Sequence, residues 1–326
     1  MFEPQYTVAL LMTLTSAICW GSWANTGKMT RNYRFELFYW DYDIGIVLMS
    51  LFWAFTLGSV KAGDNNTFLS NLGMADFSNM AAAMIGGFIF NIANLLLVAG
   101  INMAGLAVAF PLSIGTAMVV GVVSSYVIQP KGDVLFLAVG VALAVAAIVL
   151  DGLAYGSLPA SGPAVSKKSL AVCLISGLMM GSFAGFVTRS MTHGATLTPY
   201  SVAVFFTAGA LLCCPFVNVY FMKHPLIGEP VDFSGYFNAR GADHLWGLFG
   251  GLIWGTGGTF NFVAGGKLGV AISYAIGQSA PMVAALWGVF VWKEFAGAGG
   301  KCKGYLAGMF VCYMLALLAI SHAYAA

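Results

Sequence analysis

Two stretches of this sequence decide its fold: residues 86–128 read GGFIFNIANLLLVAGINMAGLAVAFPLSIGTAMVVGVVSSYVI, and residues 250–292 read GGLIWGTGGTFNFVAGGKLGVAISYAIGQSAPMVAALWGVFVW. They align without a gap at an offset of 164 positions. A second, shorter repeat aligns Gly21-Ser22-Trp23-Ala24 with Gly181-Ser182-Phe183-Ala184. Each long copy is mostly apolar and could cross a bilayer twice, and internal symmetry on this scale is typical of secondary transporters. The identical pairs include Gly86/Gly250, Gly87/Gly251, Ile89/Ile253, Gly105/Gly269, Ala107/Ala271, Met118/Met282, Val119/Val283 and Val127/Val291.

The composition requires a lipid environment. Of the 326 residues, 60% are hydrophobic and only 8% are charged, whereas soluble domains carry about 25% charged residues. Such a chain cannot cover a water-exposed surface, so lipid must solvate it. The 41 glycines suit close helix packing in membranes. The net charge of +2 gives no reason to expect a nucleic-acid partner.

Ten apolar segments predict an all-α polytopic membrane protein with ten transmembrane helices. Each is close to the roughly 20 residues that cross the hydrocarbon core, and helices satisfy every backbone group internally. The segments are too long for the roughly 10-residue strands of a membrane β-barrel. They lie near 5–27, 37–60, 79–101, 104–128, 133–156, 168–190, 198–221, 244–266, 268–292 and 303–324.

The ten helices divide into two repeats of five. Residues 157–168, with Pro159, Gly162 and Pro163, form the predicted linker. We therefore expect residues 1–160 and 161–326 to be the two halves of one membrane domain. Because each half has an odd number of helices, the second half enters from the opposite side and the repeats are inverted.

Lysine and arginine set the predicted orientation. Positive residues concentrate in cytoplasmic loops, and ten of the fourteen lie on one side of the predicted bundle. That side is assigned to the cytoplasm, so both termini are predicted outside a plasma (inner) membrane. The ten are Lys28, Arg31, Arg34, Lys167, Lys168, Lys223, Arg240, Lys293, Lys301 and Lys303; the other four are Lys61, Lys131, Arg189 and Lys267.

The ninth predicted span ends in a pattern that resembles the drug/metabolite transporter superfamily: Pro281, then Ala284-Ala285, Gly288, Phe290 and Trp292-Lys293-Glu294. Lys293 departs from the family's frequent Gly-Glu ending. Trp20-Gly21-Ser22-Trp23-Ala24 resembles the opening of the ureide permease group. Asn91, Asn94 and the stretch 105–116 resemble that group and its bacterial relatives, the glucose, ribose and rhamnose sugar permeases. The resemblance implies that helices one to four and six to nine enclose a central cavity, braced by helices five and ten.

Polar side chains at depth in those helices are the predicted substrate-binding residues, because polar groups avoid lipid. Several pairs lie three positions apart, on one face of a helix. The polar positions also break the repeat: Asn94 aligns with Gly258, and Gln278 with Ile114. Helix-to-helix hydrogen bonding is the competing explanation for each of them. The set is Asn94, Gln278, Asn91, Trp20, Trp23, Ser113, Thr116, Trp254, Thr259, Asn261 and Tyr274.

Amides, hydroxyls and flat apolar faces suit a small uncharged polar solute. We expect uptake of a monosaccharide by alternating access, with a ureide or nucleobase as the alternative. An anionic solute would call for deep arginine or lysine, which no span carries at its middle. A multidrug or metabolite exporter is a further alternative. It is disfavoured because such a protein would use deep carboxylates, and the predicted spans carry few of them. The chain is expected to act as a monomer or weak dimer.

Proton coupling would need a titratable group at depth. Asp41 and Asp43 are the candidates, although salt bridges at a helix entry explain them as simply. The resemblance to the rhamnose branch implies proton symport, and facilitated diffusion stays open. The four histidines lie at span ends or in loops without catalytic spacing. The six cysteines have no CxxC spacing. We therefore predict no enzyme activity, cofactor or metal.

Overall fold

The computed structural model describes residues 1–60, 67–158 and 165–325, and all regular secondary structure in these ranges is helical. Lys61, the predicted boundary at 160/161 and half of the predicted linker, residues 159–164, lie outside them. The long helices are α1 (Tyr6–Ser22), α2 (Phe35–Phe55), α4 (Phe77–Ala104), α6 (Gly115–Ile128), α7 (Val134–Gly156), α8 (Lys167–Thr192), α9 (Pro199–Lys223), α11 (Gly241–Leu268) and α14 (Gly300–Ala325). The short ones are α3 (Phe68–Met74), α5 (Leu106–Ala109), α10 (Phe233–Phe237), α12 (Val270–Gly277), α13 (Ala280–Leu286), η1 (Trp23–Met29), η2 (Leu57–Ser59), η3 (Phe110–Ile114) and η4 (Trp287–Val291).

The prediction of an all-α polytopic membrane protein is confirmed. Across the described ranges, nine helical segments are long and apolar enough to cross a membrane. The expected span at 244–266 corresponds to α11, which has 28 residues but is not one of the nine. This helix is rich in glycine and carries Thr256, Thr259 and Asn261. The expected total of ten membrane-crossing helices therefore depends on α11.

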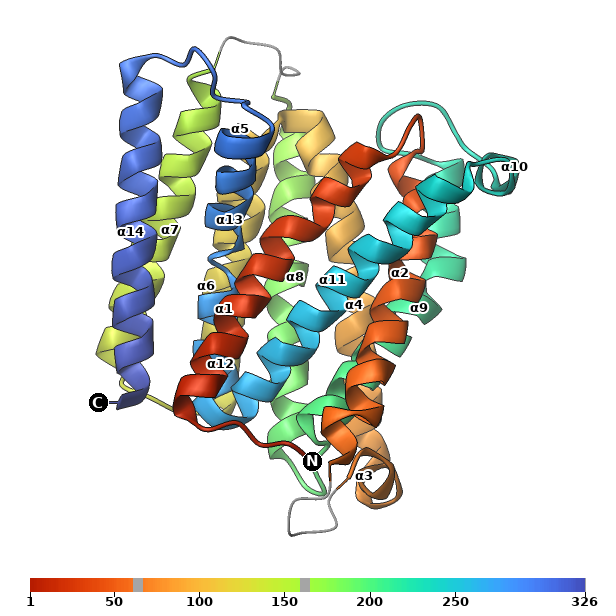
Figure 1. The fold of residues 1–326 in the computed structure, drawn as a ribbon, viewed down its shortest axis with the longest axis vertical. Helices are drawn as coiled ribbons and strands as arrows, with labels where there is room; N and C mark the ends of the chain where they lie inside the picture. The colour runs from red at the N-terminus through yellow and green to blue at the C-terminus, as the bar shows by residue number, and fades with distance from the viewer. Residues whose placement is uncertain (61–66, 159–164, 326) are drawn as a thin grey trace.

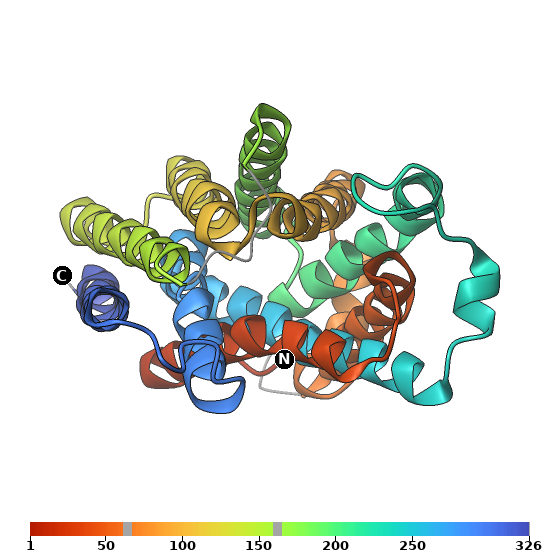
Figure 2. The ribbon, with the colours of Figure 1, turned by 90° about the horizontal axis from the view of Figure 1, so that it is seen from above.

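The helices pack in a pattern that matches the repeat in the sequence. Helix α4 packs against α8 and α9, and α11 packs against α1 and α2. Helices α7 and α14 pair with each other at one side of the bundle, and α10 projects at the opposite side (Figures 1 and 2). Both termini lie at the same end of the bundle (Figure 1). Each predicted half thus supplies one helix that packs on the first two long helices of the other predicted half.

Repeat-related glycines allow the central helices to approach their partners closely. A Cβ atom on Gly87 of α4 would overlap the carbonyl oxygen of Phe206 on α9. A Cβ atom on Gly251 of α11 would overlap the carbonyl oxygen of Tyr42 on α2. Without glycine at these two positions the helices would have to move apart, so the aligned pair Gly87/Gly251 describes the scaffold.

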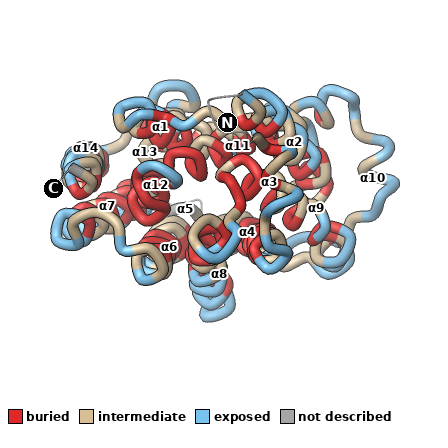
Figure 3. The backbone as a smooth tube through the Cα atoms, turned by 90° about the horizontal axis from the view of Figure 1, so that it is seen from below, coloured by how far each residue is buried: buried red, intermediate tan, exposed pale blue. Residues whose placement is uncertain are grey.

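The surface of the bundle suits lipid. Figure 3 shows buried residues facing the interior and exposed residues around the outside. Large apolar side chains, including Val127, Phe216 and Leu318, are among the exposed ones. Such residues around a soluble protein would form extensive apolar patches, whereas around a membrane bundle they meet acyl chains.

Both expected spans at the ends of the two long copies begin at a glycine that ends the preceding helix. Gly105 and Gly269 have φ of 74° and 92°, a left-handed region that glycine adopts readily. They occupy the same place in the repeat and separate α4 from α5 and α11 from α12. The segment 104–128 then includes the π-helical η3, and 268–292 is broken at Gln278 and Ser279 before α13 begins. Both segments still provide membrane-span candidates, at Phe110–Ile128 and Val270–Val291, and the turn at Gln278 borders the cavity described next.

Candidate functional site

A cavity of about 390 Å³ lies inside the bundle. Its volume is within the range of about 300–1,000 Å³ that is usual for small-molecule sites. It is bounded by α1, η1 and α13 on one side and by α4 and α8 on the other, with α2, α7, η3 and α11 completing the wall. Its polar and aromatic lining residues are Trp20, Trp23, Asn25, Lys28, Phe35, Phe38, Phe90, Asn94, Phe110, Tyr155, Phe183, Trp254, Gln278 and Glu294.

Repeat partners face the cavity from both halves. In the long repeat, Phe90 aligns with Trp254 and Ile114 aligns with Gln278. All four residues line the cavity. In the shorter repeat, Trp23 aligns with Phe183, and both residues also line the cavity. Side chains from both predicted halves therefore line the cavity, and the interface of repeats is a usual place for a transporter site.

Gln278 reaches the cavity because the ninth apolar segment is not a continuous helix. Helix α12 ends at Gly277, Gln278 and Ser279 leave the helical path, and Pro281 stands in the first turn of α13. Gly277 is needed where α12 meets α1, because a Cβ atom there would lie 2.7 Å from the ring of Trp20. Gln278 is buried yet lines the cavity, so a neutral amide stands at the break.

The deep wall combines amides with stacked aromatic rings. Trp20 and Trp254 stack with centroids 5.8 Å apart, and Phe90 lies 4.5 Å from Trp254. Asn94 donates from Nδ2 to the hydroxyl of Tyr39 at 3.0 Å. The indole nitrogen of Trp20 is buried and has no hydrogen-bond partner within the described part of the chain. A buried donor without a partner is costly, so a solute carbonyl at this wall would gain from meeting it.

The charged groups of the cavity neutralise each other at one end. Lys28 and Glu294 are the charged members of the described lining, and their side chains pair at 2.6 Å. The second carboxylate oxygen of Glu294 accepts a hydrogen bond from Tyr155 at 3.2 Å. With 47% of its side chain exposed, Lys28 lies at the mouth. The deeper cavity is therefore uncharged, which favours neutral solutes.

The opposite end, toward the chain termini, is closed. Tyr274 donates weakly to the carbonyl oxygens of Ala117 and Met180, at 3.4 Å each. Farther out, the ammonium of Lys131 donates to the carbonyl oxygen of Lys267. Burial and the neighbouring Lys267 charge lower the pKa of Lys131. The contacts of Tyr274 with Ala117 and of Lys131 with Lys267 join the two predicted halves beneath the cavity, so it runs to one end of the bundle.

The structure brings five of the predicted binding residues together and places six elsewhere. Trp20, Trp23, Asn94, Trp254 and Gln278 line the cavity. Of the others, Ser113 donates to the carbonyl of Cys173, Asn91 to the thiol of Cys214, and Asn261 to Ser16 and to the carbonyl of Ser273. Thr116 packs beside Gly177, Tyr274 closes the far end, and Thr259 is buried without a hydrogen-bond partner among the described residues. Most of these six residues contact a neighbouring helix.

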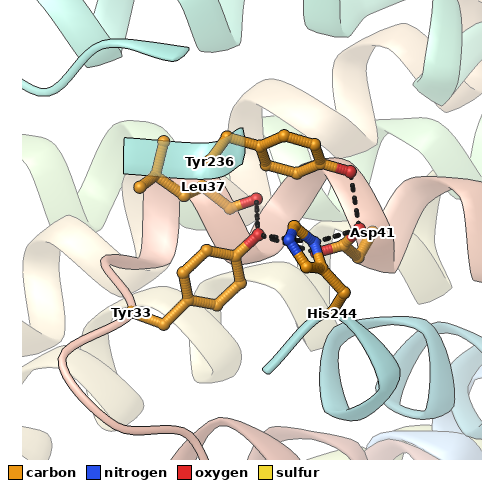
Figure 4. Close-up of polar contacts among 5 residues, drawn as sticks. All are labelled: Tyr33, Leu37, Asp41, Tyr236 and His244. Atoms are coloured by element: carbon orange, nitrogen blue, oxygen red, sulfur yellow. Dashed lines mark hydrogen bonds and ion pairs between the residues drawn. The ribbon is translucent and has the colours of Figure 1, made fainter. Parts of the chain in front are cut away.

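The two candidate coupling residues occupy different surroundings. Asp41 lies near the start of α2, where its carboxylate accepts hydrogen bonds from Tyr33, Tyr236 and the ring of His244 at 2.7 to 2.9 Å (Figure 4). Burial and the bond to Asp41 raise the pKa of Tyr33, which lies before α2. The cluster fastens α10 and the start of α11 to α2. Asp43 is wholly buried on the same helix, facing α9.

Sequence reasoning missed Asn25, Tyr155 and the Lys28–Glu294 pair. Asn25 belongs to η1, which extends the first span as a tighter helix, and its amide accepts from Trp292 at 2.5 Å. Tyr155 is on α7, a helix that the family resemblance assigns to bracing. Phe90 and Phe183 were also missed, although their alignment with Trp254 and Trp23 could have revealed them.

Comparison with known proteins gives consistent matches. The ureide permease family model matches residues 169–323. Ureide permease 5 of Arabidopsis thaliana is 23% identical, covering 95% of this chain and 92% of its own, and ureide permease 1 of the same plant is 22% identical over 86% and 87%. A protein of known crystal structure superposes with a TM-score of 0.66 at 17% identity, covering 96% of this chain and 97% of its own, which shows a shared fold. The predicted resemblance to the ureide permease group is confirmed along most of the chain.

Proposed function

We propose that this protein is a secondary transporter for a small, uncharged, nitrogen-rich polar solute of the ureide or nucleobase class. The observation that carries the proposal is the cavity, in which amides and aromatic faces surround a space whose charged residues are paired at the mouth. The similarity to plant ureide permeases supports the same class of solute. A permease of this family moves its solute without chemical conversion, so the proposal includes no enzymatic step.

The chemistry of a ureide fits this wall. A ureido group is planar and presents N–H donors on either side of a carbonyl acceptor. The side chains of Asn94 and Gln278 each offer both a donor and an acceptor, and the indole of Trp20 offers a further donor. Planar solutes also stack on indole faces such as that of Trp254. A monosaccharide would use the same amides but offers hydroxyls and no planar conjugated group, which makes it the weaker fit.

The architecture that we propose for transport is the ten-helix inverted repeat. Its support is that α11 occupies the expected eighth span and that α4 and α11 pack in equivalent ways on the opposite halves. Residues 1–160 and 161–326 would rock about the central cavity so that it opens alternately at each end. Gly105 and Gly269, at equivalent breaks, are suited to be the hinges.

The orientation follows from the distribution of positive residues. The connections after α1, α9 and η4, which carry most of the described cytoplasmic candidates, lie at the end opposite the termini (Figure 1). If that end is cytoplasmic, as the positive-inside rule predicts, the cavity faces the cytoplasm in this conformation. The protein would then be a plasma-membrane permease with external termini.

Solute counterflow in proteoliposomes tests the proposal. Vesicles are loaded with unlabelled allantoin, uracil or rhamnose, and entry of the same labelled solute is measured. We expect rapid counterflow of allantoin or uracil and little of rhamnose. Counterflow of rhamnose alone would restore the monosaccharide hypothesis, and export of lipophilic cations alone would identify a multidrug transporter. Empty liposomes and an Asn94→Ala/Gln278→Ala double variant are the controls.

A further inference from the structure

We propose that Asp43 is the proton-coupling group of this transporter and that it communicates with the solute through Tyr39 and Asn94. The inference rests on the proposed transport function, which it deepens by naming a second ligand, the proton, and its site.

Asp43 lies deep in the bundle. It is the ninth residue of α2, about 12 Å along the axis from the start of the helix and about 18 Å from its end. Its side chain is 0% exposed. The thiol of Cys214 on α9 donates to Oδ2 at 2.5 Å, and Oδ1 is buried without a partner among the described residues. An ionised carboxylate in this place would be expensive.

Among the described residues, no positively charged side chain pairs with Asp43. The titratable groups packed around it are Tyr39 and Tyr42 from its own helix and Cys213 and Cys214 from α9. Helix α4 contributes amides, and α11 meets this part of α2 through glycine, at Gly251. The described residues include no group of three His, Cys, Asp or Glu side chains that could hold a metal ion. A proton is the ligand that neutralises one isolated carboxylate.

Two side chains, Tyr39 and Asn94, lie between Asp43 and the cavity. Tyr39 lies one helical turn before Asp43, so the two side chains share a face of α2. The hydroxyl of Tyr39 accepts a hydrogen bond from Asn94 at 3.0 Å, and Asn94 lines the cavity. A solute that binds Asn94 therefore competes for, or reorients, the amide that holds Tyr39. The proposed proton site therefore lies one helical turn from Tyr39, which Asn94 links to the solute site.

The position of Asp43 at the interface of the halves supplies the coupling. The hydrogen bond to Cys214 crosses from the first half to the second. In the conformation described, the protonated carboxyl is neutral and this packing is tolerated. When the O–H bond breaks and the proton leaves to water, the carboxylate favours the arrangement in which α2 and α9 separate enough to admit water. Proton and solute thus bias the same two conformations, which is the requirement for coupled binding.

The test separates exchange from accumulation in proteoliposomes, with labelled uracil or allantoin as the probe. With a gradient of one pH unit, wild-type protein should accumulate solute up to about tenfold if one proton accompanies each molecule. Asp43→Asn should keep counterflow, because exchange needs no net proton movement, and should lose accumulation. Asp43→Glu, which retains a carboxyl group, should keep part of it. Asp151→Asn is the comparison, because Asp151 is also fully buried, on α7, with both oxygens unpartnered among the residues described.

Accumulation by Asp43→Asn equal to that of the wild type would overturn the proposal, as would loss in Asp151→Asn alone. A second measurement uses the wild type only and so does not depend on how the variant folds. A solute gradient should carry protons into vesicles that contain a pH-sensitive dye, and no proton movement during solute flux would also overturn it. Absence of solute counterflow in the wild type would instead reject the proposed function itself.

Discussion

Removing the Asn94 amide is the most direct test of solute binding in the cavity, and the structure allows the loss of binding free energy to be estimated. The amide has two N–H donors and one carbonyl acceptor, and one donor already serves Tyr39. One donor and one acceptor remain for the solute. Each hydrogen bond contributes about 0.5–1.5 kcal/mol net, so Asn94→Ala should weaken binding by about 1–3 kcal/mol. The dissociation constant should therefore rise about 5-fold to about 150-fold.

Calorimetric titration of purified protein with the solute identified by counterflow measures this change. The matched control is Asn218→Ala, because Asn218 is an equally buried amide that donates to the carbonyl of Glu36 on α2 and does not line the cavity. Both variants should melt at lower temperature than the wild type, but only Asn94→Ala should bind more weakly. Equal loss of affinity in the two variants, or wild-type affinity in Asn94→Ala, would refute the assignment of Asn94 to the solute-binding site.

Three further predictions concern packing, charge and orientation. Gly251→Ala should lower the melting temperature, because overpacking costs about 1–3 kcal/mol; Gly241→Ala, where nothing lies within 4 Å of the added carbon, should not. Glu294→Gln should change the affinity for an uncharged solute by less than about fivefold, since partly exposed ion pairs contribute about 0–1 kcal/mol; a much larger loss in titrations would indicate a charged solute. A membrane-impermeant maleimide should label Glu3→Cys in intact cells and Asn238→Cys only after permeabilisation, and the reverse pattern would invert the predicted orientation.

The fold could be predicted largely because hydropathy and repetition are strong signals. Segments of about 20 apolar residues have few alternatives to a membrane helix. The aligned residues Gly105 and Gly269 both have positive φ, so the internal sequence repeat corresponds to equivalent backbone geometry at these positions. The break within the ninth segment has a local signal, because Pro281 is tolerated in the first turn of a helix but not in its interior, whereas the contact made at the break is tertiary. Gln278 leaves the helix where α12 and α13 pack against α1, and no local sequence rule specifies that contact.

The candidate site could be predicted only in part, because depth does not reveal direction. Asn91 and Asn94 are one turn apart on α4, yet Asn94 lines the cavity and Asn91 donates to Cys214 on α9. Ser113 precedes the cavity-lining Ile114 but bonds to the backbone of α8. Choosing between such neighbours requires knowing which helix lies on each side. Sequence spacing gives the face of a helix, and only the packing assigns that face to a cavity or to a partner.

The symmetric scaffold explains why the polar residues need not be symmetric. Positions 114 and 278 are equivalent and both line the cavity, but one holds isoleucine and the other glutamine. A solute such as a ureide has a polar edge and flat faces, so its polar edge can meet Asn94 and Gln278 while its other side rests on apolar atoms such as those of Ile114. Two glutamines would leave one amide without a partner, at a cost of about 1–3 kcal/mol if buried. Ile114→Gln should therefore weaken binding even though it adds hydrogen-bonding capacity, and tighter binding by that variant would show that the asymmetry has another origin.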